Sequence, residues 1–308
     1  MCRLLGYAAP SPRTTRSVLS GNQSAVFQDM TQLHKDGWGS AWLAPTVLPG
    51  NAEPAGSLIP DAPTSVHKER SPESGAGSLD LTEALAERLS SAQIVHLRMA
   101  TDGMSCRAEN THPFLVDGLA FAHNGSLMPA QSIDAFIDPS IAAGLRGDTD
   151  SERYFAVIRS KIAGGLDLFD AVCETVAELR PLFPDASMNA LILSQDALIA
   201  VHASADAEVP HDLFDASGLS EADLPQDHRT AYYLMRQRRL DDGTILFASS
   251  GLDIVGWEPL PPESVTRVDL STLTTETRVL SPREVVNTVD GTSTTFRAIA
   301  AGPAKTTA

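Results

Sequence analysis

The first ten residues, MCRLLGYAAP (residues 1–10), place a cysteine directly after the initiator methionine. Residues 2–9 are mostly apolar and predict a short strand that begins at this cysteine. If Met1 remains, Cys2 is an ordinary thiol near the end of the chain. If Met1 is removed, Cys2 carries both a nucleophilic sulfur and a free α-amine.

A terminal cysteine can serve as its own base. The ordinary pKa is about 7.7 to 8.0 for an α-amine and about 8.5 for a thiol, so little free energy separates the two positions of the proton. An N-terminal threonine assisted by its own amine works in the same way and needs no separate histidine. Cys2 is therefore a candidate nucleophile for attack on an amide.

Attack on an amide also requires hydrogen-bond donors for the oxygen that becomes negative. The segment GLAFAHNGSL (118–127) has an apolar run that ends in Asn-Gly, which predicts a strand leading into a tight turn. There Asn124 offers its side-chain nitrogen, and Gly125 offers its backbone N–H without a Cβ to prevent close approach. The alternative is that Asn124 and Gly125 only form a hairpin turn.

Two charged residues suit the recognition of an amino acid. Arg98 ends the apolar stretch IVHLR, so we expect it to be partly buried, with either a structural carboxylate or a substrate carboxylate as its partner. Asp150 stands where a helix is predicted to begin, because Thr149 and Glu152 have capping-box spacing. Its carboxylate either interacts with the helix dipole or receives a substrate ammonium.

The histidines and the remaining cysteines do not predict a metal site. His96, His112 and His123 fall near predicted strand ends, but their spacing matches no common ligand pattern. The three cysteines are far apart and odd in number, so neither a disulfide framework nor a zinc site is indicated. Cys106 and Cys173 are expected to be small, buried or half-buried hydrophobic residues.

The remaining pattern predicts strands toward both ends of the chain and helices in the middle. A helix over 81–90 would place Leu81, Leu85 and Leu89 on one stripe. A second helix is predicted to begin near Asp150, and a third covers 166–180. The other predicted strands cover 37–44, 92–100 and 244–250, and residues 187–203 are predicted to form two strands. This order indicates an α+β protein in which antiparallel sheets carry helices on their outer faces.

Composition excludes several classes of protein. The 308 residues are 43% hydrophobic and 20% charged, which is typical of a globular protein with a sizeable core. A formal charge of −16 would repel nucleic acid. No stretch is long and apolar enough for a membrane span or a secretory signal, so neither nucleic acid nor membrane is an expected partner and the expected location is cytoplasmic.

Six motifs occur in order along the chain: MCRLLGY (1–7), HKDGWG (34–39), HLRMAT (96–101), ENTHPF (109–114), FAHNGSL (121–127) and GDTDSE (147–152). Together they resemble the class II glutamine amidotransferases, which are N-terminal-nucleophile hydrolases. The similarity is strongest to the small stand-alone bacterial branch, which includes the enzyme that removes a γ-glutamyl group during ergothioneine assembly. It extends to about residue 270, where residues 248–270 resemble the closing strands of the family.

The resemblance implies a four-layer αββα sandwich of the α+β class, and no cofactor. It implies that Cys2 attacks the γ-carbonyl of glutamine or of a γ-glutamyl compound, with its amine as base. A thioester would form, and glutamate and ammonia or an amine would be released. The other implied site residues are the oxyanion donors Asn124 and Gly125 and the substrate-binding residues Arg98, Thr101 and Asp150.

We expect residues 1–280 to form the amidotransferase domain, with an irregular Pro-rich insertion at 45–80 and a flexible tail at 281–308. Too few residues follow position 270 for a synthase domain. The chain would therefore hydrolyse a γ-glutamyl amide on its own, or supply ammonia to a synthase on another chain, or serve as a non-catalytic binding module. Association of this chain into a homo-oligomer is a further alternative.

Overall fold

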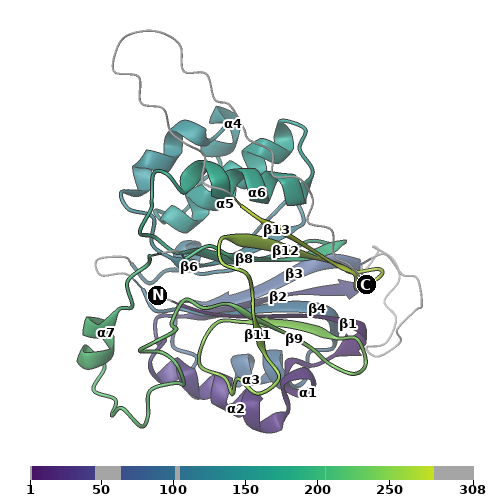
Figure 1. Cartoon of the computed structure of the whole chain (residues 1–308), viewed down its shortest axis with the longest axis vertical. Helices are drawn as coiled ribbons and strands as arrows, with labels where there is room; N and C mark the ends of the chain where they lie inside the picture. The colour runs from purple at the N-terminus through teal and green to yellow at the C-terminus, as the bar shows by residue number, and fades with distance from the viewer. Residues whose placement is uncertain (1, 46–63, 101–104, 205, 281–308) are drawn as a thin grey trace.

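Two antiparallel sheets lie face to face, with helices on the outer face of each (Figure 1). The computed structural model describes residues 2–45, 64–100, 105–204 and 206–280. Within these ranges the layers run helix, sheet, sheet, helix, which confirms the predicted αββα sandwich. No helix of the described residues is long and apolar enough to cross a lipid bilayer.

The first sheet has seven strands in the order β11-β9-β10-β1-β4-β2-β3, all with antiparallel neighbours. Its strands are β1 (Arg3–Arg13), β2 (Trp38–Pro45), β3 (Thr64–Ser71), β4 (Ser90–Leu97), β9 (Arg236–Arg239), β10 (Ile245–Ala248) and β11 (Glu258–Pro259). Because β1 lies in the middle of this sheet, the start of the chain is held by a strand on either side.

The second sheet has six strands in the order β13-β12-β8-β7-β6-β5, again all antiparallel. Its strands are β5 (Phe114–Val116), β6 (Leu119–Gly125), β7 (Met188–Leu193), β8 (Ala197–His202), β12 (Ser264–Asp269) and β13 (Thr275–Val279). The strands β3 and β5 are edge strands of their respective sheets.

Helices cover both sheets, and Figure 1 shows α1 to α3 on the first sheet and α4 to α6 on the second. The helices are α1 (Thr15–Leu19), α2 (Gly21–Asp29), α3 (Leu79–Ala86), α4 (Pro139–Ala142), α5 (Asp150–Ala163), α6 (Leu168–Leu179) and α7 (His211–Ala216). Short 3-10 helices cover Met30–Gln32, Ala108–Asn110 and Ala130–Phe136. As predicted, α5 begins at Asp150, and the Thr149 side chain accepts a hydrogen bond from the backbone N–H of Glu152.

The side chains of β1 alternate between two cores. Leu4 and Ala8 pack between the sheets, whereas Leu5 and Tyr7 pack against the helices, and each is at most 1% exposed. A strand that is buried on both faces appears in the sequence as a continuous apolar run, which is what residues 4–9 display. Full burial of one such leucine stabilises the fold by about 1.5 to 3 kcal/mol.

Two expected elements differ from the structure. The predicted helix over 81–90 is α3, which ends at Ala86, and Leu89 lies beyond it and is 58% exposed. The strand β4 begins at Ser90 instead, because the Ser90 hydroxyl hydrogen-bonds the backbone N–H and carbonyl of Leu43 on β2. The spacing of apolar residues therefore predicted a helix that extends beyond the C-terminal end of α3.

The expected irregular insertion at 45–80 is wrong for residues 64–71, which form β3. This strand pairs with β2 along its whole length, from Thr64 opposite Pro45 to Ser71 opposite Trp38. Pairing with a distant strand supplies hydrogen bonds that composition cannot reveal. Residues 46–63 and the expected tail at 281–308 lie outside the described residues.

Candidate active site

Cys2 immediately precedes β1, a strand of the first of the two facing sheets. Arg3 is paired with Leu97 on β4, so the next residues outward, Cys2 and Arg98, lie at the same end of neighbouring strands. Cys2 is only 6% exposed, and its Sγ lies 3.8 Å from the backbone carbonyl oxygen of Met99. The predicted nucleophile therefore sits inside the molecule rather than at a frayed end.

Asn124 contacts the nitrogen of Cys2 from the opposite sheet. The Cys2 backbone nitrogen donates to Asn124 Oδ1 at 2.8 Å. The other end of the same amide, Asn124 Nδ2, is buried and has no hydrogen-bond partner among the described residues. Because an unsatisfied buried donor costs about 1 to 3 kcal/mol, it indicates a group that awaits a ligand.

Gly125 is the last residue of β6, where no larger residue fits. A Cβ at this position would lie 1.7 Å from the Ser187 carbonyl oxygen and 2.5 Å from His123 Nε2. The expected turn at Asn124 and Gly125 is wrong, because both residues remain in β6 and pair with β7. The turn that precedes β6 is at Asp117 and Gly118, whose φ angles are 52° and 75°.

Arg98 is buried, at 2% exposed. Its guanidinium donates to two backbone carbonyl oxygens, that of Asp36 at 3.1 Å and that of Ser105 at 3.4 Å. No carboxylate among the described residues forms an ion pair with it. A buried cation held by carbonyls alone retains an unsatisfied preference for an anion.

Asp150 complements Arg98 with a buried negative charge. It is 3% exposed, and its Oδ2 accepts a hydrogen bond from the backbone N–H of Leu127 at 2.7 Å. That bond pins the segment that follows Gly125 to the start of α5. No lysine or arginine in the described part of the chain forms an ion pair with Asp150. Thr101, the remaining predicted site residue, lies outside the described residues.

The surroundings of Cys2 favour the thiolate. Burial raises the pKa of its thiol, but the positive charge of the N-terminal amine and then His96 lower it more strongly, and the net pKa is about 5. An amine on Cys2 itself would lie closer to the sulfur than that of Met1, so removal of Met1 preserves the direction of this effect. By contrast, burial raises the pKa of the Cys173 thiol to about 12.

Three histidines that are distant in sequence lie beneath this site. The ring centres of His96 and His112 are 4.4 Å apart, and none of their four ring nitrogens has a hydrogen-bond partner in the residues that the structure describes. His123 is anchored instead, with Nδ1 2.9 Å from the Ser151 hydroxyl and Nε2 3.1 Å from the Ser187 carbonyl. Burial, followed by the charges of His96 and His123, lowers the pKa of His112, so it stays neutral. No group of three or more potential ligands in the described ranges could hold a metal ion.

Sequence reasoning missed the residues that hold Arg98 in position. The backbone N–H of Asp36 donates to the Arg98 carbonyl, and the Asp36 carboxylate accepts from the backbone N–H of Ala100. Asn110 Nδ2 donates to the Ser105 carbonyl, which is also an acceptor for Arg98. Asp36 lies in HKDGWG and Asn110 in ENTHPF, so two of the motifs contain these residues. Only the fold shows that they hold Arg98 in position.

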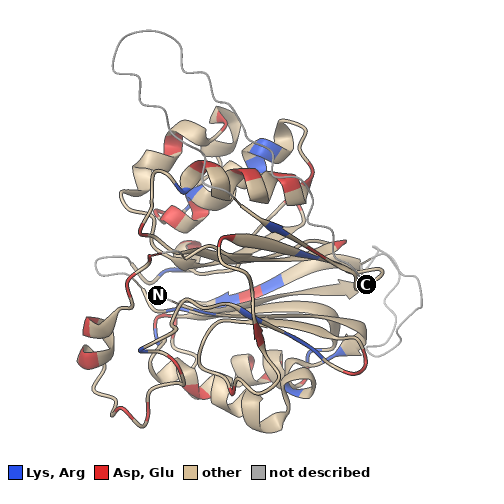
Figure 2. Cartoon of the chain, viewed as in Figure 1, with Lys and Arg blue, Asp and Glu red and all other residues tan. Residues whose placement is uncertain are grey.

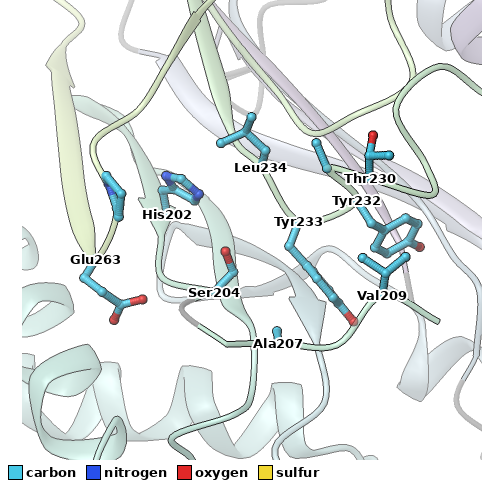
Figure 3. Close-up of a pocket in the computed structure, with 11 residues that line it drawn as sticks. His202, Ser204, Ala207, Val209, Thr230, Tyr232, Tyr233, Leu234 and Glu263 are labelled. Carbon is cyan, nitrogen blue, oxygen red and sulfur yellow. The ribbon is translucent and has the colours of Figure 1, made fainter.

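A cavity of about 280 Å³ lies close to the site, between β8 and the segment 230–234. Figure 3 shows the side chains of His202, Ser204 and Tyr233 around this cavity. Tyr232 forms part of its wall and lies under Arg3, whose guanidinium carbon is 3.8 Å from the ring centre. Because Arg3 directly follows Cys2, this contact places the cavity near Cys2. Burial raises the pKa of both tyrosines.

Comparison with known proteins agrees with this geometry. The sequence pattern of the family described as glutamine amidotransferases class-II matches residues 1–232. No curated protein matches the chain.

Among solved structures, a glutamine aminotransferase class-II domain protein from Silicibacter pomeroyi has a TM-score of 0.57 at 18% identity and covers 91% of this chain and 100% of its own. Glutamine phosphoribosylpyrophosphate amidotransferase from B. subtilis, solved with ADP and GMP, has a TM-score of 0.55 at 14% identity. That match covers 91% of this chain and 49% of the B. subtilis chain. At such identities the structural matches establish the fold.

Proposed function

This chain belongs to the class II glutamine amidotransferases, a family that hydrolyses the amide of glutamine, and from that premise we propose a stand-alone amidohydrolase with Cys2 as its N-terminal nucleophile. Its substrate would be glutamine or another γ-glutamyl amide. The observation that carries the proposal is the contact of 2.8 Å between the Cys2 nitrogen and Asn124 Oδ1, together with the unpaired, buried Asn124 Nδ2 beside the same residue.

The first half of the proposed reaction forms a thioester. The Cys2 sulfur attacks the γ-carbonyl carbon, and the thiol proton resides on the Cys2 amine. The carbonyl oxygen becomes an oxyanion that accepts hydrogen bonds from Asn124 Nδ2 and the Gly125 N–H. The C–N bond then breaks, and the Cys2 ammonium returns its proton to the leaving nitrogen, which departs as ammonia or an amine.

The second half releases glutamate. Water attacks the thioester carbon and gives a proton to the Cys2 amine. The C–S bond breaks, the sulfur leaves as the thiolate while the amine keeps the proton taken from water, and glutamate dissociates. The amine therefore serves as acid in the first half and as base in the second, and His96 assists by lowering the pKa of the thiol.

The substrate backbone would be held by charge. We assign its α-carboxylate to Arg98, which has no carboxylate partner among the described residues, and its α-ammonium to Asp150, with Thr101 nearby. A planar guanidinium binds a carboxylate through two parallel hydrogen bonds. The pair would position the γ-amide over the sulfur and reject amides that lack both charges.

The test is glutamate release by purified protein whose intact mass shows that it begins at Cys2. We expect release from glutamine or at least one γ-glutamyl amide. Cys2→Ala should lower it by at least about a thousandfold, because binding and oxyanion stabilisation alone give little rate. Cys173→Ala, which removes a buried thiol far from the site, is the matched control. Undiminished turnover by Cys2→Ala, or by protein that retains Met1, would exclude this mechanism.

A second candidate is a subunit that supplies ammonia to a synthase on another chain. It is favoured by the match to the B. subtilis amidotransferase, in which this fold covers 49% of a longer chain. Measurement of glutamine hydrolysis with and without co-purifying proteins separates the two candidates. Activity that depends on a partner would favour the subunit, whereas full activity of the isolated chain favours the stand-alone enzyme.

A further inference from the structure

A second pocket lies at the side of the sandwich, away from Cys2. It has a volume of about 470 Å³ and is bounded by the edge strands β3 and β5 and by residues of α4 and α5. In the first sheet, β4 and β2 separate β3 from β1, so the pocket does not share the surroundings of the nucleophile. All of its lining residues are described.

Four cations line this pocket, in a chain whose formal charge is −16. They are Lys68 and Arg70 from β3, Arg146 from the turn before α5, and Arg159 from α5. Figure 2 shows that acidic residues are instead scattered over the helices that cover the sheets. A concentration of positive charge against the overall sign of the molecule requires a local reason.

Two of these cations are unpaired. Neither Lys68 nor Arg146 forms a side-chain hydrogen bond or ion pair with any described residue, while Arg70 donates to the Thr111 carbonyl at 2.6 Å. Arg159 is paired with Asp117 at 3.0 Å, but that aspartate is 75% exposed on its side chain.

The two carboxylates of the pocket do not balance this charge. Both oxygens of Glu152 are engaged by backbone N–H groups, Oε1 by Arg146 at 3.0 Å and Oε2 by Gly147 at 2.6 Å. Glu109 is exposed at the rim. Two carboxylates therefore oppose four cations, and although Glu109 and Glu152 both act on Arg70, the pocket keeps an excess of positive charge.

This arrangement is electrostatically unfavourable when the pocket is empty. Burial and then the like charges of Arg70 and Arg146 lower the pKa of Lys68 to about 8. A bound anion would relieve that repulsion and favour the charged lysine. Clusters of groups that repel each other in a cavity are typical of binding sites, where the ligand supplies the missing charge.

The rest of the lining is apolar. Phe114 and Leu115 on β5, Phe155 on α5 and Leu145 before α5 present hydrocarbon surface next to the cations. A cavity of this size and mixed character suits a small organic molecule. An inorganic ion would satisfy the cations but leave the apolar half unfilled.

We propose that this pocket binds a small organic anion, in which a carboxylate or phosphate meets Lys68, Arg70 and Arg146 while an apolar body lies on Phe114 and Leu145. The site is distinct from that of the γ-glutamyl substrate and does not depend on the proposed reaction. The turn that carries Arg146 leads into α5, the helix that begins with Asp150.

Calorimetric titration of the full chain with phenyl phosphate, benzoate and phenol tests the proposal. We expect saturable binding of one or both anions and none of phenol, and the tighter anion identifies whether phosphate or carboxylate is preferred. Lys68→Met combined with Arg146→Ala should weaken that binding at least tenfold. Arg16→Ala, which removes an exposed cation on α1, is the matched control and should bind unchanged.

A second measurement separates a local effect from misfolding. Because Lys68 has a pKa of about 8, the affinity of the native chain for phenyl phosphate should fall between pH 7 and pH 9.5, and Lys68→Met should flatten that change. The other charged groups that face Lys68 in the pocket are Arg70, Arg146, Arg159, Glu109 and Glu152. Binding of phenol equal to that of the anions, absence of binding, or an equal loss in Arg16→Ala would overturn the proposal.

Discussion

At the scale of single residues, the reactivity of Cys2 arises from opposing contributions. Burial disfavours the thiolate, but the N-terminal positive charge and His96 favour it more, which sets the pKa near 5. At neutral pH the sulfur is then already ionised and the amine holds the proton. Ionisation before the substrate arrives removes one proton transfer from the first step.

This predicts the pH dependence of alkylation. The rate of iodoacetamide modification, followed by mass spectrometry at the Cys2 peptide, should be half-maximal near pH 5 and level above about pH 7. His96→Asn should move the midpoint upward, because it removes a favourable interaction with the thiolate. A midpoint near the ordinary thiol pKa of about 8.5 in the native chain would contradict the electrostatic argument.

The Arg98 guanidinium is held by two backbone carbonyls and has no carboxylate partner within the described part of the chain. Arg98→Lys should raise KM for a γ-glutamyl substrate about tenfold or more while kcat changes less, because an ammonium cannot reproduce the planar fork. Steady-state kinetics and thermal unfolding of the same sample separate binding from stability. An unchanged KM would assign Arg98 a purely structural role.

At the scale of elements, β6 brings Asn124 and Gly125, the proposed oxyanion donors, to Cys2. The strand must pass so close to Ser187 that residue 125 has no space for a side chain. Gly125→Ala should therefore destabilise the fold by about 3 kcal/mol or more, because the contact is with backbone that cannot move away easily. Gly21→Ala is the control, since its Cβ would meet nothing closer than 3.8 Å and its φ is not positive. Denaturant unfolding measures both, and equal stability of the two variants would refute the argument.

Elements with strong local signals were predictable from the sequence. The cap at Thr149 located the start of α5, and the continuous apolar run located β1. Elements whose stability comes from distant partners were not, because β3 depends on pairing with β2, and α2 carries a mostly polar sequence with only Ser24 and Phe27 buried. The Asn-Gly pair was misinterpreted for the same reason, since β7 holds it extended.

At the scale of the whole molecule, the interface between the sheets holds the site together, because Cys2 directly precedes β1 of one sheet and Asn124 lies on β6 of the other. Leu191 is fully buried in this interface. Leu191→Ala should lower the free energy of unfolding by about 2 to 5 kcal/mol. Leu89→Ala, at a position that is 58% exposed, should change it by less than about 0.5 kcal/mol. Similar losses in both variants, measured by denaturant unfolding, would show that this layer does not dominate stability.

The sequence by itself determined the class of fold, the family and the kinds of side chain present. These are a cysteine in second position, an amide beside a glycine, an arginine after an apolar run and an aspartate at the start of a capped helix. Those conclusions rest on local spacing and ordered motifs, which the linear chain contains. Only the tertiary structure decided which of them meet, because the contact from Cys2 to Asn124 joins residues 122 positions apart. It also brought His96 to His112 and gathered the cations of the side pocket. Such contacts depend on how two sheets stack and which edges align, and no local pattern encodes them.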